Sequence, residues 1–323
     1  MRRRLAVETA KGDAHVVGVG MGMDGRRVGK FSAGLLAAAI VLLAPVADAQ
    51  QGPPAQQDPF GGKFGSWQIA QQPRQAAQLA ELMGTALGGL QAQRPGHQDV
   101  YLITASLWDD PVFQNEATQA EHILRQHLHA DGRSILLSAG DGGSNRQYPD
   151  ASPDNLAAGI GKVGTLINPA EDLVVVFITT HGTHDGAAAL RENNRLAGSM
   201  HPVNLRDMLN GAGIYNRVVI ISACFSGAFI APLMDDNTIV LTAAAADRSS
   251  FGCQPERDWT FFGDAYFNHA LAGGAGMLDA FDQAKRLVEQ WEHEQNLTPP
   301  SNPQRFVGGH AAQMLRQAEQ AAH

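Results

Sequence analysis

The sequence predicts an α/β protein in which helices cover both faces of a mainly parallel sheet, a three-layer α/β/α arrangement. Two apolar runs support this prediction, residues 173–178 and 218–222. Both are short, rich in β-branched residues and apolar on both faces, which is typical of strands buried between two layers of helices. Strand-like and helix-like segments also alternate along the chain, which favours right-handed crossovers between parallel strands.

The expected elements follow one another from residue 99 onward. Apolar runs predict strands at residues 99–105, 134–137, 173–178, 218–222 and 238–243. Apolar residues at helical spacing predict helices at residues 115–129, 154–167, 203–209, 228–234, 258–271 and 277–294. Residues 186–196 read as a small hairpin, and residues 307–318 as a last amphipathic segment. We expect the helix at 228–234 to begin near the end of the preceding strand.

An export signal is predicted near the N-terminus. Arg26, Arg27 and Lys30 precede an apolar run at residues 31–44, and the small residues of Ala-Asp-Ala at 47–49 fit a signal peptidase site. The apolar run is short for a bilayer span, which argues against a stable membrane anchor. The sequence therefore predicts a signal peptide over residues 1–49 and an exported protein, periplasmic or secreted. Met21 and Met23 are alternative starts.

The segments beyond the signal differ in composition. Residues 50–66 are rich in Gln, Gly and Pro, which is typical of a flexible leader. Prolines also interrupt the pattern at residues 299–303. We expect, in order, a flexible leader at 50–66, a helical lead-in at 67–98, the main domain at 99–298 and a C-terminal extension at 299–323.

Composition excludes one broad class of partner. The 323-residue chain has a formal net charge of -8, and 44% of its residues are hydrophobic. Affinity for a phosphate backbone requires clustered Lys and Arg, and no such cluster stands outside the N-terminal segment. We therefore expect a globular protein that does not bind nucleic acid. The oligomeric state is left open.

Two residues fit for chemistry follow the two central strands. His181 and Gly182 follow the run at 173–178, and Cys224 follows the run at 218–222. Carboxyl ends of parallel strands meet on one rim of the sheet, which is where ligands bind in open α/β folds. An imidazole and a thiol on that rim can act as base and nucleophile, and Gly182 permits a close approach to the backbone. This chemistry requires no cofactor.

These motifs resemble those of the legumain-like cysteine peptidases, which have the caspase-like fold. The resemblance rests on His181-Gly182, on Ala-Cys-Phe-Ser-Gly at 223–227, and on the stretches 242–244, 248–253 and 262–266. It covers residues 99–271 and implies an exported, bacterial-type cysteine endopeptidase that acts on peptides or proteins. In this family's mechanism Cys224 would form a thioester, His181 would move the proton, and the backbone N–H groups of Gly182 and Cys224 would bind the oxyanion.

The resemblance also implies a set of substrate-binding residues. Two serines match those of the family's primary pocket, two acidic residues are candidates for its acidic wall, and Ser222 stands where the family has a glutamate two positions before the nucleophile. These candidates are Ser222, Ser249, Ser250, Glu256 and Asp258. Ordinary turn polarity is the alternative explanation for the Ser and acidic residues.

The chain departs from the family pattern at other specificity positions. Thr180 replaces the family's aspartate before the histidine, and Val112 and Phe113 stand in place of an Arg-His pair. These differences argue against a preference for cleavage after asparagine.

Four alternatives remain open at this stage. A transpeptidase would use the same dyad but resolve the thioester with an amine. A catalytically silent module would bind peptides in the cleft without cleaving them. His181, His184 and Asp185 have ligand types that could hold zinc. Cys224 and Cys253 could instead form a disulfide, since an exported protein with two cysteines often has one.

Overall fold

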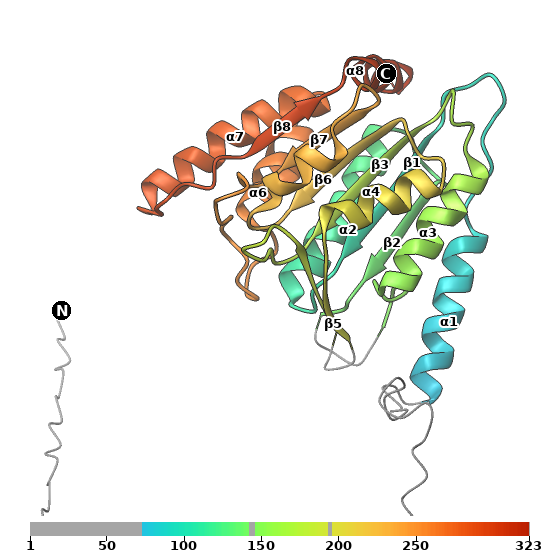
Figure 1. The fold of residues 1–323 in the computed structure, drawn as a ribbon, viewed down its shortest axis with the longest axis horizontal. Helices are drawn as coiled ribbons and strands as arrows, with labels where there is room; N and C mark the ends of the chain where they lie inside the picture. Colours follow the sequence, from blue (N-terminus) through green and yellow to red (C-terminus); the bar gives the residue numbers. More distant parts are fainter. Residues whose placement is uncertain (1–72, 142–145, 193–195, 323) are drawn as a thin grey trace, which may run out of the picture. The chain divides into compact units, whose positions relative to one another are not determined.

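A six-stranded sheet forms the centre of the molecule (Figure 1). The computed structural model describes residues 73–141, 146–192 and 196–322, so the predicted signal peptide and leader lie outside the described residues. The sheet has the order β2-β1-β3-β6-β7-β8, with every neighbouring pair parallel except β7 and β8. Its strands are β1 (Val100–Ser106), β2 (Ser134–Ser138), β3 (Leu173–Thr179), β6 (Arg217–Ser222), β7 (Thr238–Thr242) and β8 (Gln304–Val307).

Helices cover both faces of this sheet. One face packs against α2 (Pro111–His127), α6 (Phe261–Gly263), the wide-turned helix η2 (Asp264–Leu271), α7 (Met277–Glu294) and α8 (Gly309–Ala321). The other packs against α1 (Pro73–Gly88), α3 (Pro153–Leu166), α4 (Pro202–Gly211), the short turn η1 (Ser226–Phe229) and α5 (Ile230–Leu233). The predicted three-layer arrangement around a mainly parallel sheet is confirmed.

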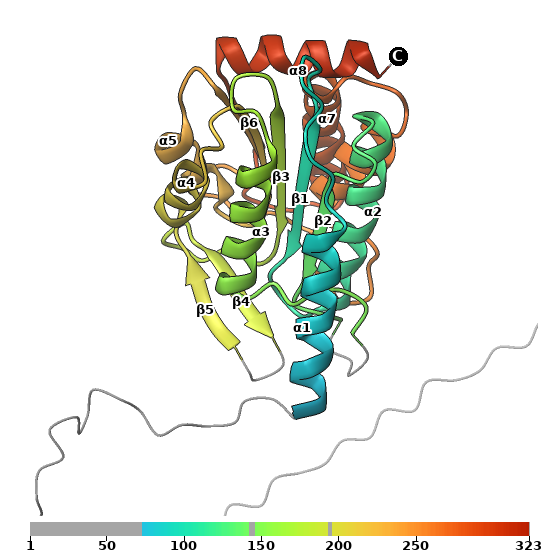
Figure 2. The ribbon, with the colours of Figure 1, turned by 90° about the vertical axis from the view of Figure 1, so that its right-hand side faces the viewer.

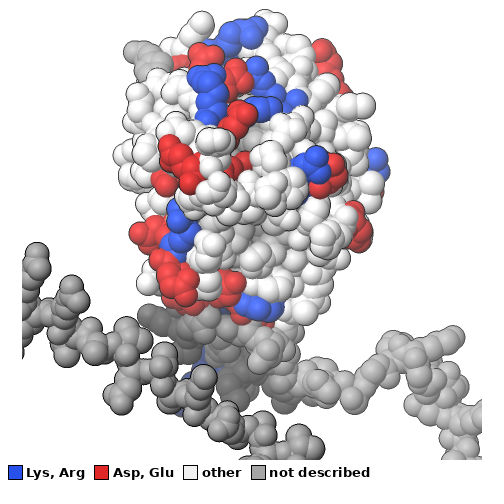
Figure 3. Space-filling view, turned by 90° about the vertical axis from the view of Figure 1, so that its left-hand side faces the viewer, with Lys and Arg blue, Asp and Glu red and all other residues white. Residues whose placement is uncertain are grey.

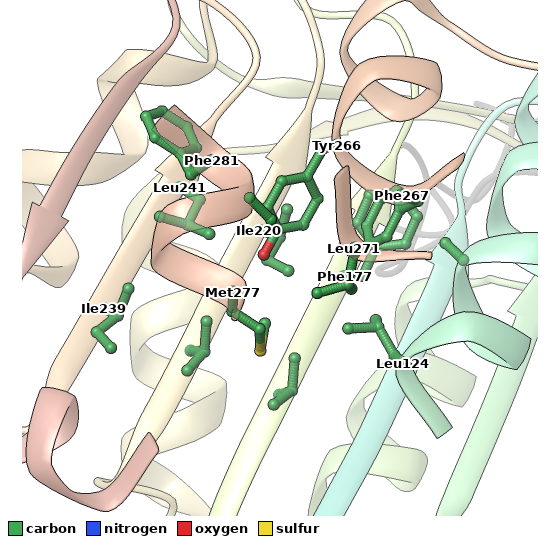
Figure 4. Packing of buried hydrophobic residues seen from close by; sticks show 14 of the residues in the cluster. Leu124, Phe177, Ile220, Ile239, Leu241, Tyr266, Phe267, Leu271, Met277 and Phe281 are labelled. Carbon is green, nitrogen blue, oxygen red and sulfur yellow. The ribbon is translucent and has the colours of Figure 1, made fainter. Parts of the chain in front are cut away.

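The central strands are apolar at most positions because they contribute to two cores. In β3, Val175 and Phe177 pack on the side of α2 and α7, while Val174 and Val176 pack on the side of α3 and α4. Successive side chains of a strand point to opposite faces, so a continuous apolar run fills both layers. Figure 4 shows one of these cores, where Phe177 lies among side chains from several helices.

The two ends of the sheet are covered differently. Helix α8 crosses the amino-terminal ends of the strands, where Ala311 N–H donates to the carbonyl of Asp236 just before β7 (Figure 2). An antiparallel hairpin of β4 (Ala188–Glu192) and β5 (Leu196–Met200) lies at the opposite, carboxyl-terminal end. The hairpin begins where we expected one and extends four residues beyond the expected end at residue 196.

Three expectations need correction. The expected helix at 228–234 is a single 3-10 turn followed by one turn of α-helix, and the expected helix at 258–271 begins only at Phe261. Strand β8 has no apolar alternation and was not predicted. Because β8 pairs with β7 and α8 contributes Met314 and Leu315 to the core, the expected extension at 299–323 lies inside the domain rather than after it.

The surface shows mixed charge on the face drawn in Figure 3, where basic and acidic side chains are interspersed. An example of such pairing is Arg305, whose Nη1 lies 3.0 Å from Oδ1 of Asp282. In the described part of the chain, no helix combines the length and apolarity that crossing a bilayer requires.

Candidate active site

The register of the two central strands brings His181 and Cys224 to equivalent positions. Thr179, the last residue of β3, is the partner of Ser222, the last residue of β6. His181 and Cys224 each stand two residues beyond this pair, on adjacent parallel strands. The segments that carry His181 and Cys224 therefore leave the sheet at the same height and on the same rim.

Gly182 lies directly against the backbone of Cys224. A Cβ added at Gly182 would be 1.8 Å from the carbonyl oxygen of Cys224 and 3.0 Å from its amide nitrogen. Only glycine fits this approach, so the residue has a steric reason to follow His181. Within the part of the chain that the structure describes, neither the Gly182 nor the Cys224 N–H donates a backbone hydrogen bond.

The Cys224 thiol receives a hydrogen bond from the loop after β7. The backbone N–H of Ser250 donates to Cys224 Sγ at 3.3 Å, and Ser250 Oγ lies 3.6 Å from the same sulfur. The sulfur also lies 3.6 Å from the Ser250 carbonyl oxygen, to which the thiol donates. The helix expected at 228–234, with its amino end near the thiol, has only one α-helical turn. The Ser250 amide contacts the thiol in its place.

His181 lies between two aromatic rings and a carboxylate. The rings of Trp108 and Phe113 meet the imidazole edge-on, with centroids 5.0 and 4.9 Å away. Asp110 Oδ2 lies 3.5 Å from Nε2. Burial lowers the pKa of His181, although the carboxylate of Asp110 acts in the opposite direction. The imidazole is therefore neutral near pH 7 and able to accept a proton.

Arg191 of β4 joins this group from the hairpin. Its Nη2 lies 2.9 Å from Asp110 Oδ1, its Nε contacts Asp109, and its guanidinium carbon lies 4.1 Å from the centre of the Trp108 ring. The hairpin is thereby attached to the loop that follows β1. The Arg191 N–H also donates to the Leu107 carbonyl at 2.9 Å, which fixes the backbone of this attachment.

Both cysteines are free in the structure. Cys253 is close to the site, since its thiol is hydrogen-bonded to Ser250 and its charge would interact with that of Cys224. Burial raises the pKa of the Cys253 thiol to about 12. Cys253 is therefore protonated at neutral pH, and a protonated thiol is a poor nucleophile. The Cys224 sulfur, in contrast, accepts the backbone N–H of Ser250.

Ser222 has a different place from the one expected. Its side chain is only 2% exposed, and its hydroxyl lies 3.1 Å from Oγ1 of Thr260. Glu116 of α2 lies in the same buried cluster and accepts the Thr260 N–H at 2.9 Å. Burial raises the pKa of Glu116. The assignment of Ser222 to substrate binding is therefore wrong for this structure, because the hydroxyl has no accessible surface to offer.

The other predicted pocket residues are exposed or half-buried. Ser250 contacts Cys224, and Ser249 precedes it in an exposed position. Asp258 is exposed and accepts a hydrogen bond from Asn115 of α2 at 3.3 Å. Glu256 is exposed in the same loop. Ser250 is thus the one of these residues that the structure brings into contact with the thiol.

The positions that depart from the family pattern are filled by structural contacts. Val112 and Phe113 are fully buried, and Phe113 packs against His181. The Thr180 hydroxyl is buried and donates to the Ala189 carbonyl of β4 at 2.6 Å. Where the family has charged residues, this chain thus has side chains that pack against His181 or bond to β4.

The residues proposed for zinc do not converge. The His184 ring packs on Phe225 with centroids 4.5 Å apart, and Asp185 lies 3.9 Å from His201. Within the described ranges, no three His, Cys, Asp or Glu side chains form a group that could hold a metal ion. A zinc site of the kind considered requires at least three such ligands.

Sequence reasoning missed Asp110 and Arg191. A usable signal existed for Asp110, since two acidic residues follow the strand at 99–105 after three intervening residues, on the rim shared with His181 and Cys224. Arg191 had no such signal. It lies 81 positions from Asp110 in the chain, and only the docking of the hairpin brings the two together.

Comparisons with known proteins identify one family model that matches part of the chain. The model of the Peptidase C13 family matches residues 151–307, a segment that contains His181, Cys224 and Ser250 but begins after Asp110. No curated protein matches the chain significantly. Among solved structures, the chain is similar to caspase-1 from Spodoptera frugiperda, with 9% sequence identity, 68% of this chain and 93% of that chain covered, and a TM-score of 0.44.

Proposed function

We propose that this chain, which matches the Peptidase C13 family model over residues 151–307, is a cysteine endopeptidase with Cys224 as nucleophile and His181 as its base. The family match supports cysteine peptidase activity in general. The finer proposal rests on the register of β3 and β6, in which the paired residues Thr179 and Ser222 each precede one member of the dyad by two positions.

The reaction proposed for this site has two stages. His181 takes the proton of the Cys224 thiol, and the thiolate attacks the carbonyl carbon of the scissile bond. The tetrahedral intermediate collapses when His181 gives the proton to the leaving amine, which breaks the C–N bond and leaves a thioester. Water then attacks the thioester carbonyl and gives a proton to His181. The C–S bond breaks, which releases the acid, and His181 returns the proton to the Cys224 sulfur.

The negative oxygen of the intermediate requires donors at a fixed place. The N–H groups of Gly182 and Cys224 are neighbours, as the contact distances of a Cβ added at Gly182 indicate. Two backbone donors of this kind form an oxyanion hole, and loss of one typically costs about 3 kcal/mol of transition-state stabilisation. The Ser250 N–H, which donates to the sulfur, supports the thiolate before the attack.

A thiol-reactive peptide electrophile tests the proposal directly. We expect a peptidyl acyloxymethyl ketone library to label the wild-type protein at Cys224, as located by peptide mass spectrometry, and to leave Cys253 unmodified. Cys224→Ala should abolish labelling and His181→Ala should reduce it strongly. Labelling that is equally fast in the His181→Ala variant would contradict the dyad. No cleavage of a mixed peptide library by reduced wild-type protein would contradict peptidase activity.

We also propose that the protein is exported. The supporting pattern is the basic start, the apolar run at 31–44 and the small residues at 47–49, all of which lie outside the described residues. Mass spectrometry of the exported protein should find its N-terminus at or near Gln50. Retention of residues 26–44 in that protein would contradict the proposal.

A further inference from the structure

The two cysteines of the chain contact the same serine. The 323-residue sequence has only these two, Cys224 after β6 and Cys253 after β7, and both are free and half-buried. Ser250 Oγ lies 3.6 Å from Cys224 Sγ, and the Cys253 thiol is hydrogen-bonded to the same hydroxyl. The two sulfurs are therefore no more than two hydrogen-bond lengths apart.

Backbone contacts hold the two cysteine-bearing segments together. The N–H of Phe225, next to Cys224, donates to the Arg248 carbonyl at 2.7 Å. The N–H of Ser250 donates to Cys224 Sγ at 3.3 Å. The loop that leads to Cys253 is thus attached to the segment after β6 at two points. The proximity of the two sulfurs follows from the backbone of the fold rather than from the rotamer of one side chain.

On its other side, Cys253 leads into an exposed turn. Residues 254–256 are exposed, and the Arg257 N–H closes the turn by donating to the Gln254 carbonyl at 3.1 Å. Exposed backbone with few packed contacts shifts at small cost in free energy. The Cβ atoms of a disulfide lie about 3.5–4.5 Å apart. Rotation of the two thiols to other staggered rotamers and a small shift of this turn are the movements that such a bond requires.

The two thiols differ in their chemistry. Burial raises the pKa of the Cys253 thiol to about 12, so Cys253 is protonated near pH 7 and reacts slowly with an oxidant. Cys224 can give its proton to His181 in the mechanism proposed above, and the thiolate is the form that a peroxide oxidises. Oxidation therefore begins at Cys224, with a second, protonated thiol close by.

We propose that Cys253 is the resolving thiol of Cys224, so that a peroxide converts the pair into a Cys224–Cys253 disulfide that dithiols can reduce. The Cys224 thiolate attacks one oxygen of hydrogen peroxide, the O–O bond breaks, and the departing hydroxide takes up the proton that Cys224 lost. Cys224 is then a sulfenic acid. The Cys253 sulfur attacks the sulfenic sulfur, the S–O bond breaks, and the hydroxyl leaves as water with the Cys253 proton. The two thiols lose two electrons, which reduce one peroxide to two waters.

Proximity offsets the protonated state of Cys253 in the second step, because two groups held together react as if one were present at very high concentration. Without such a partner, further peroxide converts a sulfenic acid to sulfinic and sulfonic acids, which dithiols do not reduce. Formation of the disulfide therefore stops peptide cleavage reversibly. This consequence rests on the function proposed above, whereas formation of the bond does not.

The test exposes the reduced full-length protein to a small molar excess of hydrogen peroxide. Wild type is compared with Cys253→Ser and Cys253→Ala, and the melting temperature of each protein is measured beforehand. Remaining thiols are blocked with iodoacetamide, and digestion without reductant followed by mass spectrometry locates the products. A second portion is reduced with dithiothreitol before the thiols are blocked.

In wild type we expect the Cys224 and Cys253 peptides to be joined, with two hydrogen atoms fewer than the separate peptides. Dithiothreitol should restore about tenfold more alkylatable Cys224 in wild type than in either variant, because Cys224 in the variants proceeds to sulfinic and sulfonic acids. Dimedone, which traps sulfenic acids, should label Cys224 in both variants and little in wild type. Serine keeps the size of the side chain and alanine removes its polarity, so agreement between the two variants excludes an effect of the new side chain.

Three outcomes would overturn the inference. In the first, Cys224 of wild type becomes sulfinic while Cys253 can still be alkylated. In the second, dithiothreitol restores Cys224 equally in all three proteins. In the third, the joined peptides come only from disulfide-linked dimers, which a non-reducing gel separates from the monomer.

Cleavage of a peptide library by the same samples tests the proposed function separately. A wild type that forms the reversible disulfide but cleaves no peptide before oxidation supports this inference and contradicts the peptidase. A wild type that cleaves peptides but forms no Cys224–Cys253 disulfide contradicts this inference alone.

Discussion

Substitution of Gly182 by alanine changes a contact that joins the segments after β3 and β6, which carry His181 and Cys224. The added methyl carbon would lie 1.8 Å from the carbonyl oxygen of Cys224, 2.6 Å from its carbonyl carbon and 3.0 Å from its amide nitrogen. All three atoms belong to the backbone, so no side-chain rotation can relieve the overlap.

The size of the effect follows from these distances. A carbon and a carbonyl oxygen approach to about 3.3 Å at closest, so the ends of β3 and β6 must separate by roughly 1.5 Å. A displacement of about 1 Å in a catalytic group typically costs a factor of about 100 in rate. Overpacking of this kind also costs about 1–3 kcal/mol of stability, which lowers the melting temperature of a domain of this size by roughly 2–12 °C.

The assay compares kcat/KM on the best peptide of a library for wild type, Gly182→Ala and Gly161→Ala. Gly161 lies in α3, and a Cβ there would meet nothing within 4 Å, so its alanine variant is the matched control. We expect at least a hundredfold loss for Gly182→Ala and wild-type activity with equal or higher stability for Gly161→Ala. If Gly182→Ala keeps activity within threefold and its melting temperature is unchanged, the reasoning about the strand ends and the oxyanion donors is refuted.

Three further predictions concern individual side chains. Cys224→Ala and His181→Ala should each abolish turnover of a mixed peptide library, and the double variant should be little worse than either single variant. His184→Ala should keep most of the activity. Chelator-sensitive turnover that survives Cys224→Ala would instead indicate a metal mechanism. Cys253→Ser should keep most of the activity, and both thiols should be reduced in the active protein. A Cys224–Cys253 disulfide in active protein, detected by mass spectrometry, would contradict the thiol mechanism. Burial raises the pKa of Glu116 in the folded state, so the free energy of unfolding falls as pH rises above the unfolded pKa of about 4.3. Glu116→Gln should therefore raise the melting temperature more at pH 7 than at pH 4. Equal shifts at both pH values would show that Glu116 is not buried in this way.

The parallel core of the fold could be predicted from the sequence because its signal is local. In β3 residues 173–178 are apolar at every position, and this pattern distinguishes a strand between two helical layers from a half-exposed one. His181 and Cys224 could be named as candidates for the same reason, since each stands within three residues of the end of such a run. Strand β8 escaped prediction because its burial alternates only weakly and its partner β7 lies far away in the chain.

The finer structure of the site depended on long-range contacts that no local pattern encodes. Ser222 looked like a substrate-binding residue from its place before Cys224, yet its hydroxyl packs against Thr260, and Glu116 reaches the same cluster from 144 positions away.

The sequence by itself determined which strands carry the thiol and the imidazole, because the apolar pattern and the residue after it are neighbours in the chain. Only the tertiary structure decided what surrounds them. Asp110 faces His181 rather than capping its own helix because the hairpin brings Arg191 to it, and Ser250 donates to Cys224 because the loop after β7 folds back over the rim. Both contacts depend on the packing of segments that are distant in sequence, and the free energy of that packing is a property of the whole fold.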